Sequence, residues 1–337
     1  MKKNTLNRMS AEELLNLKLK NLRLSIKGSN MEKRISRLYY ELEKKGLFFK
    51  PHIWISEEWF TPDDIAGFAI PFYLFHPVLL KLEKEQVFEA EGAELSECLK
   101  IMRHETGHAI SHAYQLYKLK EWKKIFGDYR EPYPLWYTPE IKSKDYVTHL
   151  NAWYAQAHPL EDFAETFAVW LNPKSNWKKQ YENWPAFEKL NYLDALMNDI
   201  KDREPIIKTK EEYAQLSKSK RTIGDYYKRK KKFYTVKWAQ SFDEELKKIF
   251  TITENKNSLS AERFLKSVRK NIRKNISEVL DIPQYTIDQL IRELIIRSIK
   301  LNLQLKLKKE EAFEKLIIII TAQLINLIHT GYYRIPL

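Results

Sequence analysis

Cysteine is almost absent from this sequence, and so are long apolar segments. The 337 residues include one cysteine, Cys98, which excludes an intramolecular disulfide framework. The first thirty residues lack the continuous apolar core of a signal peptide. The longest apolar run, 316–328, contains polar residues and is too short to span a bilayer, so we expect a buried helix there. Together these absences favour a cytoplasmic protein.

The chain does contain ample material for a large core. Hydrophobic residues make up 44% of the sequence and aromatic residues 13%, which predicts a globular protein with room for two domains. The formal net charge is +13, and most of it falls in residues 201–275, where 22 Lys+Arg stand against 10 Asp+Glu. The sequence therefore combines a globular body with a basic segment.

Two of the eight histidines belong to an HExxH box, His104-Glu-Thr-Gly-His108. Residues 95–118 contain no proline and carry apolar residues at helical spacing, which predicts a helix with a buried face. Side chains four positions apart share a helix face, so His104 and His108 can direct their ring nitrogens at one zinc ion. Glu105 can then serve as the general base for zinc-bound water. The alternative is a chance occurrence of the box, with two histidines satisfied in the core.

A catalytic zinc site needs a third protein ligand. Residues 159–170 predict a second helix, because Pro159 suits a first turn, acidic residues follow it, and apolar residues recur at helical spacing. We expect Glu161 to complete the ligand set. Glu165 lies one turn further along the same face, where it can accept the free ring N–H of a ligand histidine. The alternative for this segment is an ordinary amphipathic helix with an acidic first turn.

Three residues near these motifs are expected to have structural roles. Asp162 is rotated by about 100° from Glu161 around the helix, so it caps the helix or pairs with a basic side chain. His112 stands too far along a continuous helix to join a zinc ion held by the two box histidines. Cys98 falls on the apolar face of the first helix and is expected to pack rather than to act as a nucleophile.

The order of an HExxH helix and a second helix with Glu-xxx-Glu resembles the gluzincin branch of the zincin-like metallopeptidases. More narrowly, the sequence resembles the family of putative zinc-binding metallopeptidases over roughly residues 35–250. The strings that carry this resemblance are 67–73 (GFAIPFY), 103–109 (RHETGHA), 125–128 (IFGD), 153–171 (WYAQAHPLEDFAETFAVWL) and 222–228 (TIGDYYK).

The resemblance implies a zincin-like fold, with a small sheet beside the HExxH helix. It supports zinc ligation by His104, His108 and Glu161, with Glu105 as the base. It also implies a role for Tyr154, because in some gluzincins a tyrosine seven residues before the ligand glutamate donates its hydroxyl to the oxyanion. His158, in the same loop, is a rival for that role.

The remaining segments predict a division of the chain into four parts. Residues 1–48 are expected to form an N-terminal helical segment, 49–200 the metallopeptidase domain, 201–258 a basic helical extension and 259–337 a bundle of three helices. Within the second part, the aromatic and β-branched stretches 49–60 and 68–75 predict short strands. The prolines of 119–158 predict a loop-rich connection that lines the cleft.

These observations predict an α+β protein, in which a zincin-like catalytic domain with a small mixed sheet and two metal-site helices is joined to an all-α C-terminal region. The expected activity is zinc-dependent hydrolysis of peptide bonds in a peptide or protein, with Zn²⁺ as the cofactor. One alternative is a non-catalytic zinc-bearing scaffold. The other is a binder of nucleic acid or an anionic surface that uses the basic segment, above all Lys228, Arg229, Lys230, Lys231 and Lys232.

Overall fold

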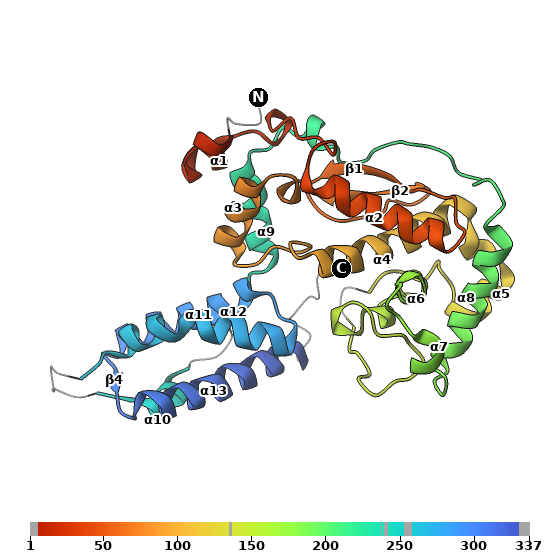
Figure 1. Ribbon diagram of the computed structural model, residues 1–337. Coiled ribbons are helices and arrows are strands. Elements are labelled where there is room, and N and C mark those ends of the chain that lie inside the picture. The colour runs from red at the N-terminus through yellow and green to blue at the C-terminus, as the bar shows by residue number, and fades with distance from the viewer. Residues whose placement is uncertain (1–5, 135–136, 237, 239–241, 253–257, 330–337) are drawn as a thin grey trace. The chain divides into compact units, whose positions relative to one another are not determined.

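The computed structural model describes residues 6–134, 137–236, 238, 242–252 and 258–329. These residues form an α+β protein in which helices predominate (Figure 1). The chain divides into two compact units, which are described separately. Unit 1 consists of Met1–Gln86 and Ala90–Tyr227, and unit 2 consists of Val87–Glu89 and Lys228–Leu337.

Nine α-helices begin in unit 1, counted over the described residues. They are α1 (Ala11–Asn16), α2 (Asn30–Lys44), α3 (Pro77–Val87), α4 (Leu95–Tyr114), α5 (Lys120–Phe126), α6 (Pro159–Leu171), α7 (Trp177–Gln180), α8 (Ala186–Ile200) and α9 (Ile223–Phe233). Short 3₁₀ helices lie at Leu6–Arg8, Leu19–Asn21, Phe72–Phe75, Leu116–Lys118, Asn151–Gln156 and Leu216–Lys218.

The sheet of unit 1 is small. Strands β1 (His52–Ser56) and β2 (Gly67–Pro71) pair in parallel, and Phe60 forms an antiparallel bridge to Ala69 of β2. The small mixed sheet is therefore present, but the second strand is shorter than the sequence predicted. It ends at Pro71, because Phe72–Phe75 turns into a 3₁₀ helix whose four side chains are all buried.

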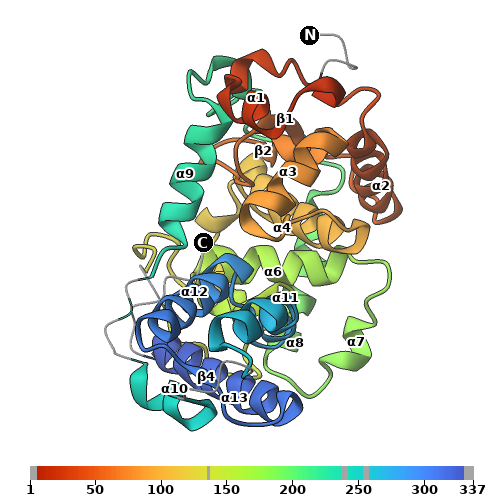
Figure 2. The same cartoon turned by 90° about the vertical axis from the view of Figure 1, so that its left-hand side faces the viewer.

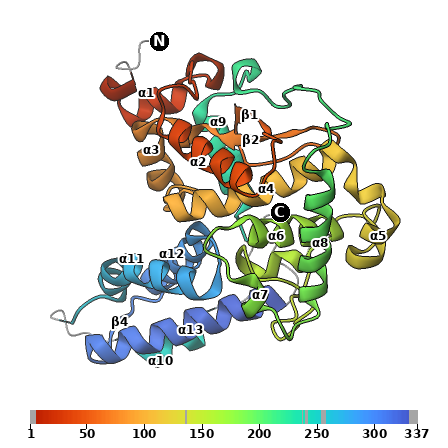
Figure 3. The ribbon, with the colours of Figure 1, turned by 45° about the vertical axis from the view of Figure 1, so that its right-hand side comes forward.

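Helix α4 runs through the middle of unit 1. In Figures 1 and 3 it passes between α2 and the sheet on one side and α6 and α8 on the other. Most of its side chains are consequently buried, including polar ones on the turn that carries the box. A buried ion pair, in which the Arg103 guanidinium donates to both oxygens of Glu41 at 2.8 and 3.0 Å, joins α4 to α2. This ion pair fixes the turn of α4 next to His104 against α2.

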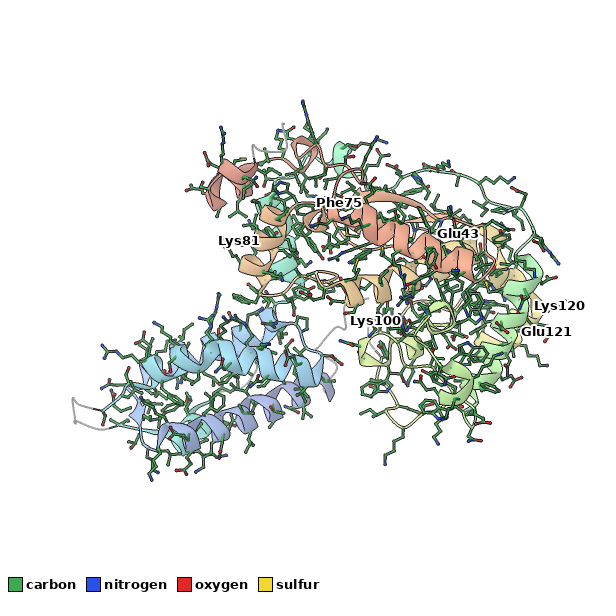
Figure 4. All side chains as sticks on the ribbon, in the orientation of Figure 1. Glu43, Phe75, Lys81, Lys100, Lys120 and Glu121 are labelled. Carbon is green, nitrogen blue, oxygen red and sulfur yellow. The ribbon has the colours of Figure 1, made fainter. Side chains whose placement is uncertain are left out.

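The core of unit 1 contrasts with its surface. Figure 4 labels Glu43, Lys120 and Glu121, which are exposed at the C-terminal end of α2 and on α5, and Phe75, which is buried. Cys98 is fully buried in this core, as its place in the sequence predicted. None of the helices in the described part of the chain combines the length and the apolar character needed to cross a membrane.

Unit 2 is built on three long helices, α11 (Ala261–Leu280), α12 (Gln284–Lys300) and α13 (Lys309–His329), with the short α10 (Asp243–Ile249) beside them (Figure 2). It has its own apolar core. The predicted bundle helices are present, but the region is not purely helical. Strands β3 (Phe250–Thr251) and β4 (Gln304–Leu305) form a short antiparallel ladder, because the connection from α12 to α13 pairs its backbone with the segment that follows α10.

Candidate metal centre

Helix α4 presents the two box histidines on one face. It begins at Leu95 and ends where Gln115 adopts a left-handed conformation, so the box lies in its central turns. Figure 4 marks Lys100, one turn before His104. The rings of His104 and His108 have centroids 4.7 Å apart, as expected for side chains separated by four residues. His104 is buried and His108 is partly exposed.

Helix α6 supplies the acidic residues. It begins at Pro159, and the Nδ1 of His158 accepts the backbone N–H of Leu160, so His158 caps the helix. Proline in the first turn and a capping side chain before it are typical of helix N-termini. Because every α6 residue after Pro159 is buried, its first-turn carboxylates are directed into the protein and not into solvent.

Gly107 allows the two helices to come together. A β-carbon at this position would lie 2.8 Å from Cα and 3.1 Å from the carbonyl oxygen of Ala164 in α6. Both contacts are with backbone atoms, which cannot rotate away as a side chain could. The glycine inside the box therefore permits a close crossing of α4 and α6, and this crossing brings Glu161 to the histidines.

Three donor atoms converge at this crossing. The Nε2 atoms of His104 and His108 are 3.1 Å apart, and each lies 3.1 Å from Oε2 of Glu161. Three ligands of a tetrahedral zinc ion, each about 2.0–2.1 Å from the metal, lie roughly 3.3 Å from one another. Both the spacing and the chemistry of two imidazoles and one carboxylate therefore fit zinc. Within the described residues, these three form a group that could hold a metal ion.

Glu165 fixes the orientation of His104. Its Oε1 lies 2.7 Å from Nδ1 of His104, and its Oε2 accepts the backbone N–H of Leu150 at 2.6 Å. A carboxylate at Nδ1 favours the tautomer in which Nδ1 carries the proton and the Nε2 lone pair is free for a metal. This is the contact that the spacing of Glu161 and Glu165 predicted.

The charges of the site act on one another. Burial alone would lower the pKa of His104, but the carboxylates of Glu161 and Glu165 outweigh it and hold that pKa well above the usual value. Burial alone would raise the pKa of Glu161, but His108 and His104 hold it below the usual range. Glu161 is therefore ionised, and a metal ion at His104 would compete with a proton.

Glu105 directly follows His104 in α4. The hydroxyl of Thr61 donates to its Oε2 at 2.8 Å. Thr61 follows Phe60, the residue that bridges to β2, so the sheet edge places this hydroxyl against the carboxylate. Thr61 was not predicted from the sequence, because no local pattern connects it to Glu105, 44 residues further along the chain.

Tyr133 is a second residue that the motifs did not reveal. Its hydroxyl donates to Oε1 of Glu161 at 2.9 Å, while its ring stacks on that of His158 with centroids 3.9 Å apart. Burial, followed by the charge of Glu161, raises the pKa of Tyr133, so the hydroxyl keeps its proton. The only signal in the sequence was general: Tyr133 lies in the proline-rich stretch predicted to line the cleft.

Tyr154 lies beside His104. Its ring centroid is 5.6 Å from that of His104, and burial raises its pKa well above the usual value. The preceding residues Ala152 and Trp153 have φ angles of 58° and 52°, a left-handed conformation that is unfavourable for side-chain-bearing residues. Such backbone strain is frequent at functional sites. His158, the rival to Tyr154, has both ring nitrogens engaged, since its Nε2 lies 2.8 Å from the carbonyl oxygen of Glu131.

The residues expected to be structural do have other partners. Asp162 accepts from the Lys189 ammonium at 2.6 Å, as the rotation from Glu161 predicted. Burial raises its pKa to about 7. His112 accepts the backbone N–H of Asp64 at its Nδ1, 3.2 Å away, and its Nε2 lies 3.8 Å from Asp63. Neither residue is in the group of three converging donors.

This geometry defines a class of site: a candidate mononuclear metal centre with a His-His-Glu donor set, in which Glu165 contacts the other ring nitrogen of His104. Residues 89–225 match the family model described as "Putative zinc-binding metallo-peptidase". The matched family is the one that the motifs indicated, and the matched segment includes both α4 and α6 and the connection between them. No curated protein and no solved structure matches the chain.

Proposed function

We propose that unit 1 is a zinc-dependent metallopeptidase of zincin-like fold that hydrolyses peptide bonds in a peptide or protein. His104, His108 and Glu161 are the zinc ligands in this proposal, and Glu105 is the general base. The observation that carries the proposal is the triangle of donor atoms 3.1 Å apart, with the Glu105 carboxylate on the same helix turn.

Each protein group has a definite task in this reaction. Zinc, when bound, supplies Lewis-acid chemistry: it polarises a carbonyl and lowers the pKa of water towards neutrality. Glu105 takes the proton of the attacking water and returns it to the leaving amine, so the protein needs no covalent intermediate. The Thr61 hydroxyl donates to Oε2 of Glu105, and within the described part of the chain no hydrogen bond is formed by Oε1, which can take that proton.

Two further residues support the reaction. Glu165 holds His104 in the tautomer that presents Nε2. Tyr154 is the proposed donor to the oxyanion, because its ring lies beside that of His104 and its raised pKa keeps its hydroxyl protonated. Removal of such a donor can cost about 3–4 kcal/mol of transition-state stabilisation.

The first test is elemental analysis for zinc, followed by a cleavage screen on a peptide library read by mass spectrometry. Glu105→Gln should retain zinc and lower hydrolysis by about 10²–10⁴-fold, because it removes only the base. The matched control is Glu97→Gln, at an exposed position on the same helix, which should change neither property.

The outcomes separate the proposal from its alternatives. Zinc bound by the wild type, with no cleavage that Glu105→Gln abolishes, would make the protein a zinc-bearing scaffold. A wild type that holds no zinc even after reloading would overturn the metal centre. That result would favour the alternative in which the basic segment binds nucleic acid or an anionic surface.

A further inference from the structure

The segment from Gly127 to Pro134 connects α5 to the metal site in a specific way. Gly127 ends α5 with φ of 112°, a conformation that side-chain-bearing residues rarely adopt. A β-carbon there would lie 3.1 Å from the ring of Pro159, the first residue of α6. The glycine therefore allows the end of α5 to pack closely on the first residue of α6, the helix that carries Glu161.

Asp128 organises the next turn. Its carboxylate accepts from the Lys123 ammonium at 2.6 Å and from the Arg130 guanidinium at 3.0 and 2.7 Å, and it also accepts the backbone N–H of Arg130. These bonds tie residues on both sides of the turn to one side chain. The Gly127-Asp128 pair, which belongs to one of the strings that carried the family resemblance, thus shapes the path of the chain towards Tyr133.

Tyr133 is then held from two directions. It lies between Pro132 and Pro134, which restrict the backbone on either side. Its ring stacks on His158 with an interplanar angle of 15°, and His158 is itself fixed by bonds to Glu131 and Leu160. The side chain therefore reaches Glu161 from a supported position, although 45% of its surface is exposed.

We propose that Tyr133 is a positioning residue for Glu161: its hydroxyl engages Oε1, so that Oε2 alone is presented to a metal ion together with the two histidine nitrogens. The inference rests on the proposed zinc site. A carboxylate can bind a metal through one oxygen or through both, and a hydrogen bond to one oxygen favours the first mode. Single-oxygen ligation leaves the fourth position of a tetrahedral zinc for water or substrate.

The same loop provides a matched control. Tyr137 also donates its hydroxyl at 2.9 Å, but to the backbone carbonyl of Ala152 and not to a proposed ligand. Tyr133→Phe and Tyr137→Phe each remove one oxygen atom and one hydrogen bond. A loss of loop order alone would affect both variants, whereas a role in holding Glu161 belongs to Tyr133.

The experiment measures zinc affinity by competition with a chromophoric chelator, and the visible spectrum of the Co²⁺-substituted protein, for wild type and both variants. Circular dichroism gives the folded fraction, to which both readouts are normalised. Tyr133→Phe should weaken zinc binding by about 10–100-fold, the range typical of lost partners of metal ligands. It should also lower the intensity of the Co²⁺ bands, because a second carboxylate oxygen would raise the coordination number. Tyr137→Phe should match the wild type in both readouts.

Wild-type affinity and an unchanged Co²⁺ spectrum in Tyr133→Phe would overturn this inference and leave the metallopeptidase proposal standing. Equal weakening in both variants would also overturn it, because the effect would then be one of loop order. A wild type without zinc would overturn both proposals together.

Discussion

Each unit of the protein buries a carboxylate among cationic partners, and the partners differ in kind. In unit 2, Asp288 is fully buried and accepts from three guanidinium groups, those of Arg269, Arg273 and Arg292, at 2.5–2.9 Å. In unit 1, Glu161 is buried against two imidazoles. Arginine stays charged at every accessible pH, whereas histidine can release its proton and offer a lone pair instead.

The difference separates a structural site from one that can bind a cation. Around Asp288 the carboxylate is saturated by permanent positive charge, so a metal ion would be repelled. Around Glu161 the histidines can become neutral and offer lone pairs, so this group of donors could hold a divalent cation. The surroundings of the carboxylate, and not its burial alone, decide what it can do.

The largest expected effect concerns the arginine cluster. Asp288→Asn keeps the size of the side chain but leaves three guanidinium groups without a carboxylate, and should destabilise unit 2 by about 3–5 kcal/mol. Hydrogen exchange of the α11 and α12 amides measures this, and zinc content should stay unchanged. Glu293→Gln, at an exposed position on α12, is the control. A loss of stability below about 1 kcal/mol would contradict this prediction, because it would be no larger than the contribution of an exposed salt bridge.

The second prediction concerns the buried carboxylate of unit 1, whose loss should affect zinc binding. Glu161→Ala should weaken zinc binding by at least about 100-fold, which corresponds to roughly 3 kcal/mol. Asp162→Ala should retain zinc and lose stability instead, because the Lys189 ammonium, with a side chain only 15% exposed, would lack its partner. Metal content after dialysis against a weak chelator distinguishes the two. Equal losses of zinc would contradict the choice of Glu161 as third ligand.

The third prediction concerns the crossing that brings the donors together. Gly107→Ala should cost about 1–3 kcal/mol of unfolding free energy and weaken zinc binding, because the added methyl group meets the α6 backbone. Ser111→Ala is the control, since its buried hydroxyl has no hydrogen-bond partner among the described residues. Thermal unfolding with and without zinc measures both variants. If Gly107→Ala changed neither the unfolding free energy nor zinc binding, the crossing of α4 and α6 would have room for the added methyl group.

The smallest effect is a pH dependence. Burial, followed by the nearby charge of His108, lowers the pKa of His112 to about 4. Because the unfolded chain binds this proton near pH 6.5, the stabilisation is present above that value and is lost as the pH falls towards 4. Between pH 7 and pH 5 the wild type should lose about 2 kcal/mol more than His112→Asn, whose amide oxygen can still accept from Asp64. Urea unfolding in a metal chelator measures this, and parallel pH profiles would refute it.

Local periodicity made much of the metal site predictable from the sequence. The spacing of His104 and His108, and that of Glu161 and Glu165, fixed which side chains share a helix face, because an α-helix has the same geometry wherever it forms. The same reasoning separated Asp162 from Glu161, and the structure gives Asp162 a lysine partner. The strands were less predictable: β2 ends at Pro71, because packing of the next four side chains into the core favours a 3₁₀ turn there.

By itself, then, the sequence determined the two helices and which of their residues share a face, and it indicated the family whose model matches residues 89–225. The tertiary structure decided which hydroxyl reaches which carboxylate. Thr61 is 44 residues from Glu105, and Tyr133 is 28 residues from Glu161. Both lie on irregular segments without a fixed period, so their positions depend on the packing of the whole unit, and no local pattern encodes them.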